Sequence, residues 1–274
     1  MSAITPVFLF CFGLLAGTSL PHTYLGADKQ PLPFSEEEIL DALRTGRIVS
    51  KRRVGEGINN PFKVLLEKDG VRLHALFRDV RVFKPRHEDP EGRVTIHFRD
   101  DCIFELAAYR LARRVGIDSV PPVVRRRLGR REGTLQLWIE DAIMNKTRHR
   151  QSLRPKLDLS WRLQWNTLYI FDYLIANDDR NQGNLLFDPQ WKLWMIDHTR
   201  AFRFMADRND VARIRLCDEE LYDALKRLDE PALKETLGDF MGDMEIEAVN
   251  NRLAHLLQHL DGLIESRGPQ MVLR

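Results

Sequence analysis

The stretch from Ala176 to Phe202 reads ANDDRNQGNLLFDPQWKLWMIDHTRAF, and it decides how the whole chain is interpreted. Two short apolar runs flank an Asp-Pro pair, which is typical of a turn, so the stretch predicts a β-hairpin. Asn184 precedes the first run and Asp197 follows the second, so the hairpin brings both to its open end. Asp179, on the loop just before, can face the same spot.

These three side chains suit metal-assisted phosphoryl transfer. The amide oxygen of Asn184 and the carboxylate of Asp197 can hold Mg²⁺, a hard ion that prefers oxygen ligands. Asp179 can accept the proton of an attacking hydroxyl. Phosphoryl transfer divides its work in this way, with a metal ion on the phosphates and a carboxylate for the nucleophile.

The chain before this stretch is predicted to be rich in β-strands. The folded body is expected to begin near Phe34, where S-x-x-E is a capping box that starts a helix. Pro61 to Phe83 predicts a hairpin around an Asp-Gly turn. Cys102 to Gly116 predicts an amphipathic helix, and Gly133 to Asp141 forms one of two further strands.

The chain after residue 141 is predicted to be mainly helical. The segments with helical patterns are Ser160 to Asn177, Asp218 to Leu228, Pro231 to Met241 and Glu245 to Ile264. The expected fold class is therefore α+β, with a small β-rich lobe over 34–140 and a helical lobe over 141–274. The polar stretch lies at their junction, where ligand clefts form.

In this pattern the chain resembles the protein-kinase-like superfamily. The spacing D-x4-N from Asp179 to Asn184, followed by thirteen residues to Asp197, is that of the kinase catalytic loop and its metal-binding aspartate. DDRNQGNLLF and MIDHTRAF are similar to elements of the atypical branch, which holds phosphoinositide kinases, HipA-like kinases and secretory-pathway Golgi kinases. Within that branch, the chain resembles bacterial proteins. The resemblance runs from Val54 to Phe202 and implies a two-lobed kinase-like fold.

The resemblance also implies a cofactor and a role for each matched acid. Asp179 matches the catalytic aspartate, and Asn184 and Asp197 match the metal ligands. The cofactors would be ATP and Mg²⁺ or Mn²⁺. The activity would be transfer of the γ-phosphate of MgATP to a hydroxyl acceptor.

The resemblance assigns roles in the small lobe as well. Glu105 matches the helix glutamate that orients the nucleotide-binding cation; a solvated helix glutamate is the alternative. Trp138 and Ile139, in LQLWIE, match the linker between lobes, where backbone groups meet adenine. Val54 to Ile58 match the phosphate loop, with fewer glycines than G-x-G-x-x-G.

Two departures from the family pattern leave questions open. Arg78, in LHALFRDV, stands where the strand register expects a lysine, and a guanidinium is a wide planar fork rather than a compact ammonium. Lys84, in VFKPRHEDP, is the alternative on chemical grounds. Asp197 is followed by HTRAF with no A-P-E segment, so the usual peptide-docking platform is absent. The phosphate acceptor is then a protein, a lipid or a small molecule.

Three functions are compatible with the sequence. The first is an active ATP-dependent phosphotransferase. The second is a pseudokinase that binds a nucleotide or a partner without turnover, which Arg78 and the glycine-poor loop favour. The third is a metal-dependent hydrolase, for which this cluster has few carboxylates and histidines. A net charge of +2 predicts no nucleic-acid partner.

The N-terminus bears on location. Ala3 to Leu20 carries no charge, so residues 1–27 are read as a signal peptide or a membrane anchor, with a misassigned start codon as the other reading. A real leader predicts an extracytoplasmic or membrane-anchored protein that associates with the membrane through this segment; otherwise the protein is cytoplasmic. The mature chain is expected to start after the apolar run. Once a leader is removed, Cys102 and Cys217 could form a disulfide.

Overall fold

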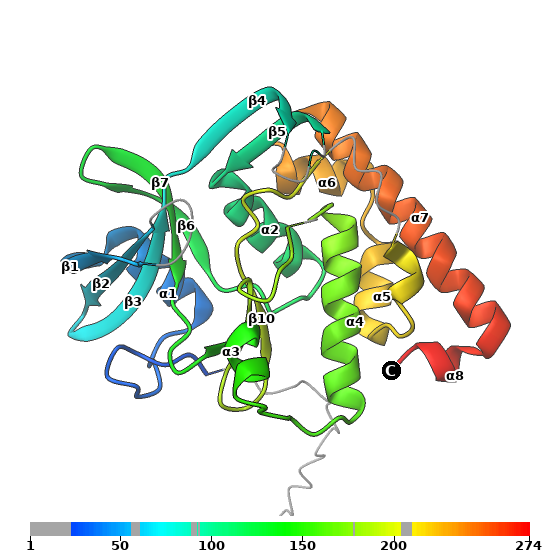
Figure 1. Cartoon of the computed structure of the whole chain (residues 1–274), viewed down its shortest axis with the longest axis horizontal. Coiled ribbons are helices and arrows are strands. Elements are labelled where there is room, and N and C mark those ends of the chain that lie inside the picture. Colours follow the sequence, from blue (N-terminus) through cyan, green and yellow to red (C-terminus); the bar gives the residue numbers. More distant parts are fainter. Residues whose placement is uncertain (1–22, 56–60, 89–91, 93, 178, 204–209) are drawn as a thin grey trace, which may run out of the picture.

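A computed structural model of the chain describes residues 23–55, 61–88, 92, 94–177, 179–203 and 210–274. A β-rich region and a helical C-terminal region lie on either side of helix α2 (Ile103–Arg114), as Figure 1 shows. The expected α+β class is confirmed.

The small lobe is built on one five-stranded antiparallel sheet. Its strands, in the order β1-β2-β3-β7-β6, are Arg47–Arg53, Phe62–Lys68, Val71–Arg78, Arg131–Leu137 and Val123–Leu128. Asp69 and Gly70 turn the chain between β2 and β3 with φ values of 50° and 77°. Positive φ at both turn residues matches the twist of the flanking strands, so the predicted hairpin turn is confirmed.

The chain leaves this sheet at Arg78, earlier than the hairpin predicted to run to Phe83. Strands β4 (Arg81–Glu88) and β5 (Val94–Asp101) then pair with each other in a separate two-stranded sheet. Strand β4 is exposed along nearly its whole length. It therefore has no alternation between a buried and a solvated face, and alternation is the signal by which sequence predicts such a strand.

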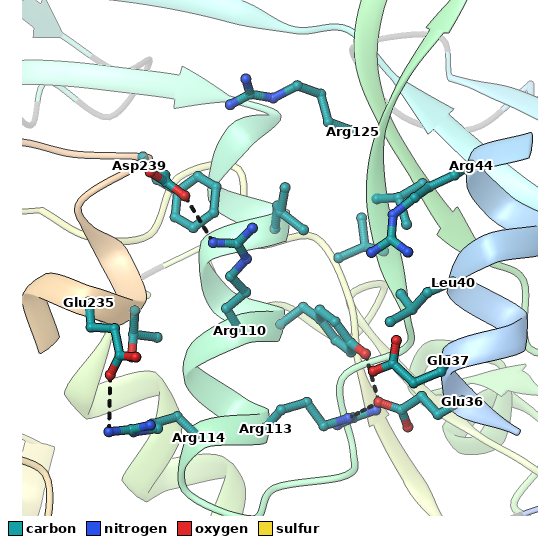
Figure 2. Close-up of a pocket in the computed structure, with 16 residues that line it drawn as sticks. Glu36, Glu37, Leu40, Arg44, Arg110, Arg113, Arg114, Arg125, Glu235 and Asp239 are labelled. Atoms are coloured by element: carbon teal, nitrogen blue, oxygen red, sulfur yellow. Dashed lines mark hydrogen bonds and ion pairs between the residues drawn. The ribbon is translucent and has the colours of Figure 1, made fainter. Parts of the chain in front are cut away.

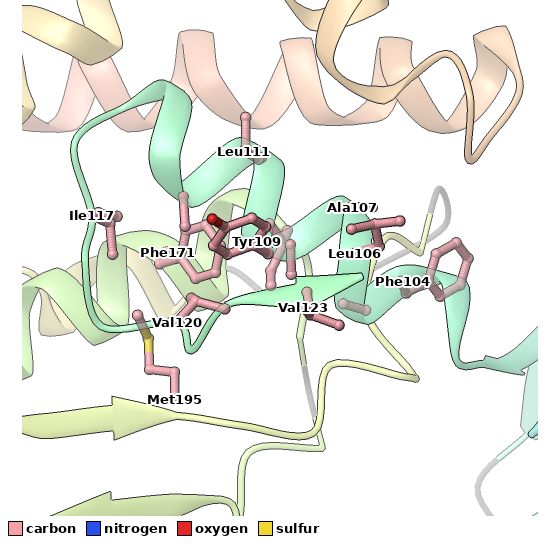
Figure 3. Packing of buried hydrophobic residues seen from close by; sticks show 14 of the residues in the cluster. Phe104, Leu106, Ala107, Tyr109, Leu111, Ile117, Val120, Val123, Phe171 and Met195 are labelled. Atoms are coloured by element: carbon pink, nitrogen blue, oxygen red, sulfur yellow. The ribbon is translucent and has the colours of Figure 1, made fainter. Parts of the chain in front are cut away.

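Helices α1 (Glu36–Thr45) and α2 join the sheet to the rest of the molecule. The predicted capping box at the start of α1 is present, with Ser35 and Glu38 bonded reciprocally. Helix α2 carries the buried side chains that connect the lobes. In Figure 3, Phe104 and Leu111 of α2 lie in one cluster with side chains of β6, α4 and β10, among them Val123, Phe171 and Met195.

The helical lobe surrounds a small three-stranded sheet. Its strands, in the order β10-β9-β8, are Leu193–Met195, Leu185–Phe187 and Ile143–Met144. The helices are α3 (Asn145–Arg150), α4 (Leu159–Leu174), α5 (Glu219–Lys226), α6 (Glu230–Leu237), α7 (Asp243–Arg267) and α8 (Pro269–Val272), with a short 3₁₀ turn at Asp210–Arg213. All four predicted helical segments are present, with ends shifted by a few residues.

The chain is already folded before the predicted start at Phe34. Tyr24 is buried, its ring centroid lies 5.6 Å from that of Trp194, and the Ala27 N–H donates to the Arg72 carbonyl at 2.8 Å. Residues 23–27, which the sequence assigns to a leader or anchor, therefore pack on the body. The rest of that segment, residues 1–22, lies outside the described residues.

The described residues also bear on membrane-spanning helices and on cysteine pairing. No helix in the described ranges combines the length and the apolar composition needed to cross a membrane. Cys102 and Cys217 are both buried as free thiols, so the disulfide considered from the sequence is not formed.

Candidate functional site

The predicted hairpin brings Asn184 next to the residue before Asp197. Strands β9 and β10 pair from Phe187 opposite Leu193 to Leu185 opposite Met195. One step further, the Ile196 N–H donates to the Asn184 carbonyl at 3.2 Å. Asp197 is therefore the first residue beyond the open end of the hairpin.

The turn of this hairpin is organised by Asp188. One carboxylate oxygen accepts from the backbone N–H groups of Gln190 and Lys192 at 3.0 and 2.9 Å. The other accepts from the indole N–H of Trp194 at 3.1 Å. Asp188 is thus the turn-forming residue that the sequence indicates.

The loop from Asp179 to Asn184 is closed by the side-chain amide of Asn184. Its Nδ2 donates to the Asp179 carbonyl at 3.1 Å, so Oδ1 is the amide atom left for other partners. The guanidinium of Arg180 holds this loop in place: it donates to the carbonyls of Asn184 and Ile196 at 2.9 and 2.6 Å. The same group pairs with Asp172 of α4 at 2.8 Å, so loop, hairpin and helix are fastened together.

Asp197 lies in the left-handed region of backbone conformation. Its φ is 62°, a conformation that aspartate adopts more readily than most residues with a Cβ. The Thr199 hydroxyl donates to its Oδ1 at 3.3 Å, and Arg78 Nη2 lies 3.5 Å from its Oδ2.

Arg78 and His198 enclose the carboxylate of Glu105 from both sides. Arg78 Nη1 lies 3.1 Å from Oε1, and His198 Nδ1 lies 3.1 Å from Oε2. Glu105 and His198 are both 0% exposed, so the solvated-glutamate reading is wrong. Burial alone would raise the pKa of Glu105, but Arg78 and His198 bring it below its ordinary value.

His198 and Arg78 differ in the kind of contact that they make with Glu105. His198 follows Asp197 directly in the chain, but its side chain bonds Glu105. Arg78 Nη1 and Glu105 Oε1 are close without hydrogen-bond geometry, and both are buried atoms with no hydrogen-bond partner in the described part of the chain. The contact between Arg78 and Glu105 is therefore an ion pair, while the other terminal nitrogen of Arg78, Nη2, lies near Asp197.

Replacing Glu105 by Gln should destabilise the protein in a pH-dependent way. Because the folded-state pKa of Glu105 is lowered, its contribution to stability is complete above the ordinary value of 4.5 and declines as the pH falls through the folded-state value. Urea unfolding of parent and Glu105→Gln from pH 7 to pH 3.5 measures this. The difference in unfolding free energy should be largest at neutral pH; a difference that grows towards acid pH would contradict the assignment.

The structure places the two candidate cations differently. Lys84 is exposed on β4, where its Nζ lies 3.4 Å from His87 Nδ1 and 6.0 Å from the ring of Phe98. Arg78 is the candidate that the fold brings to Glu105 and Asp197.

The structure describes the linker between the lobes but only part of the predicted phosphate loop. The Trp138 N–H donates to the His74 carbonyl at 3.0 Å, which ties the linker to β3, and Ile139 is buried. Within the predicted phosphate loop, residues 56–58 lie outside the described residues. Asp178, which precedes Asp179 in the chain, lies outside them as well.

Sequence reasoning missed Arg200. Its Nε lies 3.1 Å from Asp100 Oδ2, and its Nη1 lies 3.4 Å from Asp179 Oδ2. Burial lowers the pKa of Arg200, but Asp179 and Asp100 outweigh this and raise it overall. The available signal was its position three residues after Asp197.

A cavity of about 1020 Å³ lies on another side of α2, among α1, β6 and α6. Figure 2 shows the ion pairs in its wall: Arg110 with Asp239, Arg113 with Glu36, and Arg114 with Glu235. None of the predicted site residues lines this cavity. It is therefore separate from the candidate site.

Solved structures with a similar fold include hydra Fam20 and the Golgi casein kinase. A structure of hydra Fam20 with sugar matches with a TM-score of 0.65 at 15% identity, over 87% of this chain and 91% of that chain. The Golgi casein kinase with Mn/ADP bound matches with a TM-score of 0.63 at 18% identity, over 87% of this chain and 78% of that one. The chain has an atypical kinase-like fold.

The kinase-like fold confirms the two-lobed architecture expected from the sequence. No protein-family model matches the chain, and no curated protein matches it either. At such low identity the structural likeness concerns the fold, so the chemistry has to be argued from the chain's own residues.

Proposed function

We propose that the protein is a phosphotransferase that moves the γ-phosphoryl group of a metal-bound nucleoside triphosphate, taken first as ATP, to a hydroxyl acceptor. The observation that carries the proposal is the joining of Arg78, Glu105 and Asp197. It places a buried guanidinium, itself paired with Glu105, beside the partly exposed carboxylate of Asp197. This is the combination that a metal-bound polyphosphate requires.

The residues present fit a divalent cation. Asn184 Oδ1 and the Asp197 carboxylate are hard oxygen donors, and Mg²⁺ commonly takes one or two protein ligands, with phosphates and waters completing its shell. Among the described residues no group of three or more His, Cys, Asp or Glu could hold a metal ion. The ligand pair therefore suits a metal that arrives with its nucleotide better than a hydrolase centre. The structurally similar Golgi casein kinase, which has Mn/ADP bound, supports the same choice.

Asp179 is the residue proposed to act on the acceptor. Its backbone carbonyl is bonded to Asn184 and its carboxylate lies near Arg200, so the side chain is held beside the metal ligands. The ion would spread the developing charge of the transferred group. Asp179 would orient the acceptor hydroxyl and take its proton.

One observation favours the pseudokinase alternative. Arg78 already lies 3.5 Å from Asp197, so a metal ion has to compete with a guanidinium for that carboxylate. A pseudokinase would then bind nucleotide weakly or without metal.

A binding screen combined with a transfer assay tests the proposed function. The full chain is titrated with ADP and ATP, each with Mg²⁺, Mn²⁺ or EDTA, while the thermal midpoint is followed. γ-Labelled nucleotide is then supplied with a protein, a lipid-vesicle and a sugar acceptor panel. Metal-dependent stabilisation with label transfer supports the proposal. Binding without transfer to any acceptor or water favours the pseudokinase, and no binding refutes both.

Arg78→Ala should weaken MgATP binding by about tenfold or more, since a charged hydrogen bond contributes about 1.5–3 kcal/mol. Lys84→Ala is the matched control and should change the dissociation constant little, because Lys84 is exposed on β4. Calorimetry measures both. Arg78→Lys, which keeps the charge, should recover part of the loss, whereas a larger effect at Lys84 would move the role to that residue.

A further inference from the structure

The face of the sheet that carries Arg78 continues towards the linker. Leu76 precedes Arg78 by two residues on β3, so both side chains lie on one face, about 7 Å apart along the strand. The register places Lys63 of β2 and Gln136 of β7 directly beside Leu76. If the phosphates lie at Arg78, as the proposed function requires, the base lies among Lys63, Gln136 and the linker.

This region contains a charged group that water hardly reaches. The Nζ of Lys63 lies 3.9 Å from the centre of the Trp138 ring and 3.9 Å from Glu140 Oε1. His74 Nδ1 contacts the same oxygen at 2.6 Å. Burial lowers the pKa of Lys63, although Glu140 opposes the shift. The ammonium and the carboxylate thus lie together beside the linker.

Gln136 adds a second, independent observation. It is 3% exposed, and its Nε2 has no hydrogen-bond partner among the residues that the structure describes. A buried donor left unsatisfied costs about 1–3 kcal/mol, so its position calls for an acceptor. The neighbouring strand residue is Leu76, which offers none from its side chain.

The chemistry of these groups matches one purine better than the other. The Watson–Crick edge of guanine presents the O6 acceptor together with the N1–H and 2-amino donors. The same edge of adenine presents a 6-amino donor and the N1 acceptor. Gln136 Nε2 and Lys63 Nζ are donors suited to a 6-oxo group. The Glu140 carboxylate is an acceptor suited to N1–H and the 2-amino group.

We propose that Gln136, Lys63 and Glu140 are specificity residues that read the base of the bound nucleotide, and that the protein prefers guanine to adenine nucleotides. The inference rests on the proposed function, because it uses the same phosphate site. It refines the donor from ATP, as the sequence resemblance implies, to GTP. The 6-amino group of adenine would instead face two donors in this region, Gln136 Nε2 and Lys63 Nζ.

Calorimetry of the full chain with MgGDP, MgADP and MgIDP tests this inference separately from catalysis. MgGDP should bind about 10- to 100-fold more tightly than MgADP, the range expected for one or two hydrogen bonds to charged groups. MgIDP, which lacks the 2-amino group, should bind with intermediate affinity. MgADP binding as tightly as MgGDP or more tightly would overturn the inference and leave the phosphotransferase proposal standing. If no nucleotide binds, both are overturned.

Two variants and one control show which residues cause the preference for guanine nucleotides. Glu140→Gln should reduce the advantage of GDP over IDP, and Gln136→Leu should reduce the advantage of GDP over ADP. Lys51→Ala is the control: Lys51 is exposed on β1 and pairs with Val64, which places it on the opposite face from Lys63. Thermal midpoints show whether each variant is folded. A folded Glu140→Gln with unchanged selectivity would remove Glu140 from the base-reading set.

Discussion

Asp179→Asn should lower the rate of phosphoryl transfer by about 10²–10⁴-fold, the usual contribution of a general base. Binding of the metal–nucleotide complex should stay close to that of the parent. The reason is geometric, because Asp179 touches the metal-ligand loop through its backbone carbonyl, which the substitution keeps. Single-turnover transfer rates measured beside calorimetric dissociation constants separate the two effects.

The control for Asp179→Asn is a substitution of the arginine beside it. Arg200 lies 3.4 Å from the Asp179 carboxylate but also holds Asp100, so Arg200→Gln should slow transfer less than Asp179→Asn does. If Asp179→Asn turns over like the parent, Asp179 has a structural role only and the assignment of the base is wrong.

Asp197→Asn should act on binding as well as on turnover. The substitution replaces a charged metal ligand by a neutral amide, so nucleotide affinity in Mg²⁺ should fall by at least about tenfold, as expected when a charge-assisted contact is lost. Affinity in EDTA should change much less, because no metal ion is then present to lose its ligand. Transfer should fall together with the metal-dependent affinity. Calorimetry in Mg²⁺ and in EDTA, with transfer rates, gives all three quantities.

A surface carboxylate supplies the comparison for Asp197. Asp239 pairs with Arg110 on the wall of the separate cavity, so Asp239→Asn should leave nucleotide binding and transfer unchanged. An Asp197→Asn variant with parental affinity in Mg²⁺ would show that the metal ion is not held there. The ligand assignment for Asn184 and Asp197 would then fail.

Local signals in the sequence predicted much of the fold and the central loop. The Asp69-Gly70 turn and the capping box at Ser35 depend on residues a few positions apart, and both are present. The hairpin that brings Asn184 towards Asp197 is likewise a short-range structure. The kinase-like architecture was implied by the resemblance of the spacing between Asp179, Asn184 and Asp197 to that of kinases.

Features that depend on distant contacts were not predictable in this way. The solvated and buried readings of Glu105 remained open because its partners, Arg78 and His198, come from other parts of the chain. The start of the fold was placed too late because Tyr24 is buried by Trp194, far along the sequence. The contact between Lys63 and Trp138 was missed because the two residues lie on different elements, far apart in the sequence.

The shared carboxylate of Glu105 has a consequence for regulation. An outward swing of α2 would separate Glu105 from its partners on both sides and strand a buried charge. Breaking a buried ion pair costs about 3–5 kcal/mol, so a swung-out conformer would make up less than about 1% of molecules at equilibrium. The contacts of Glu105 therefore favour the conformer in which Glu105 of α2 stays paired with Arg78 of β3. If the protein acts as proposed, the supply of nucleotide and acceptor, and not a movement of α2, would set its rate.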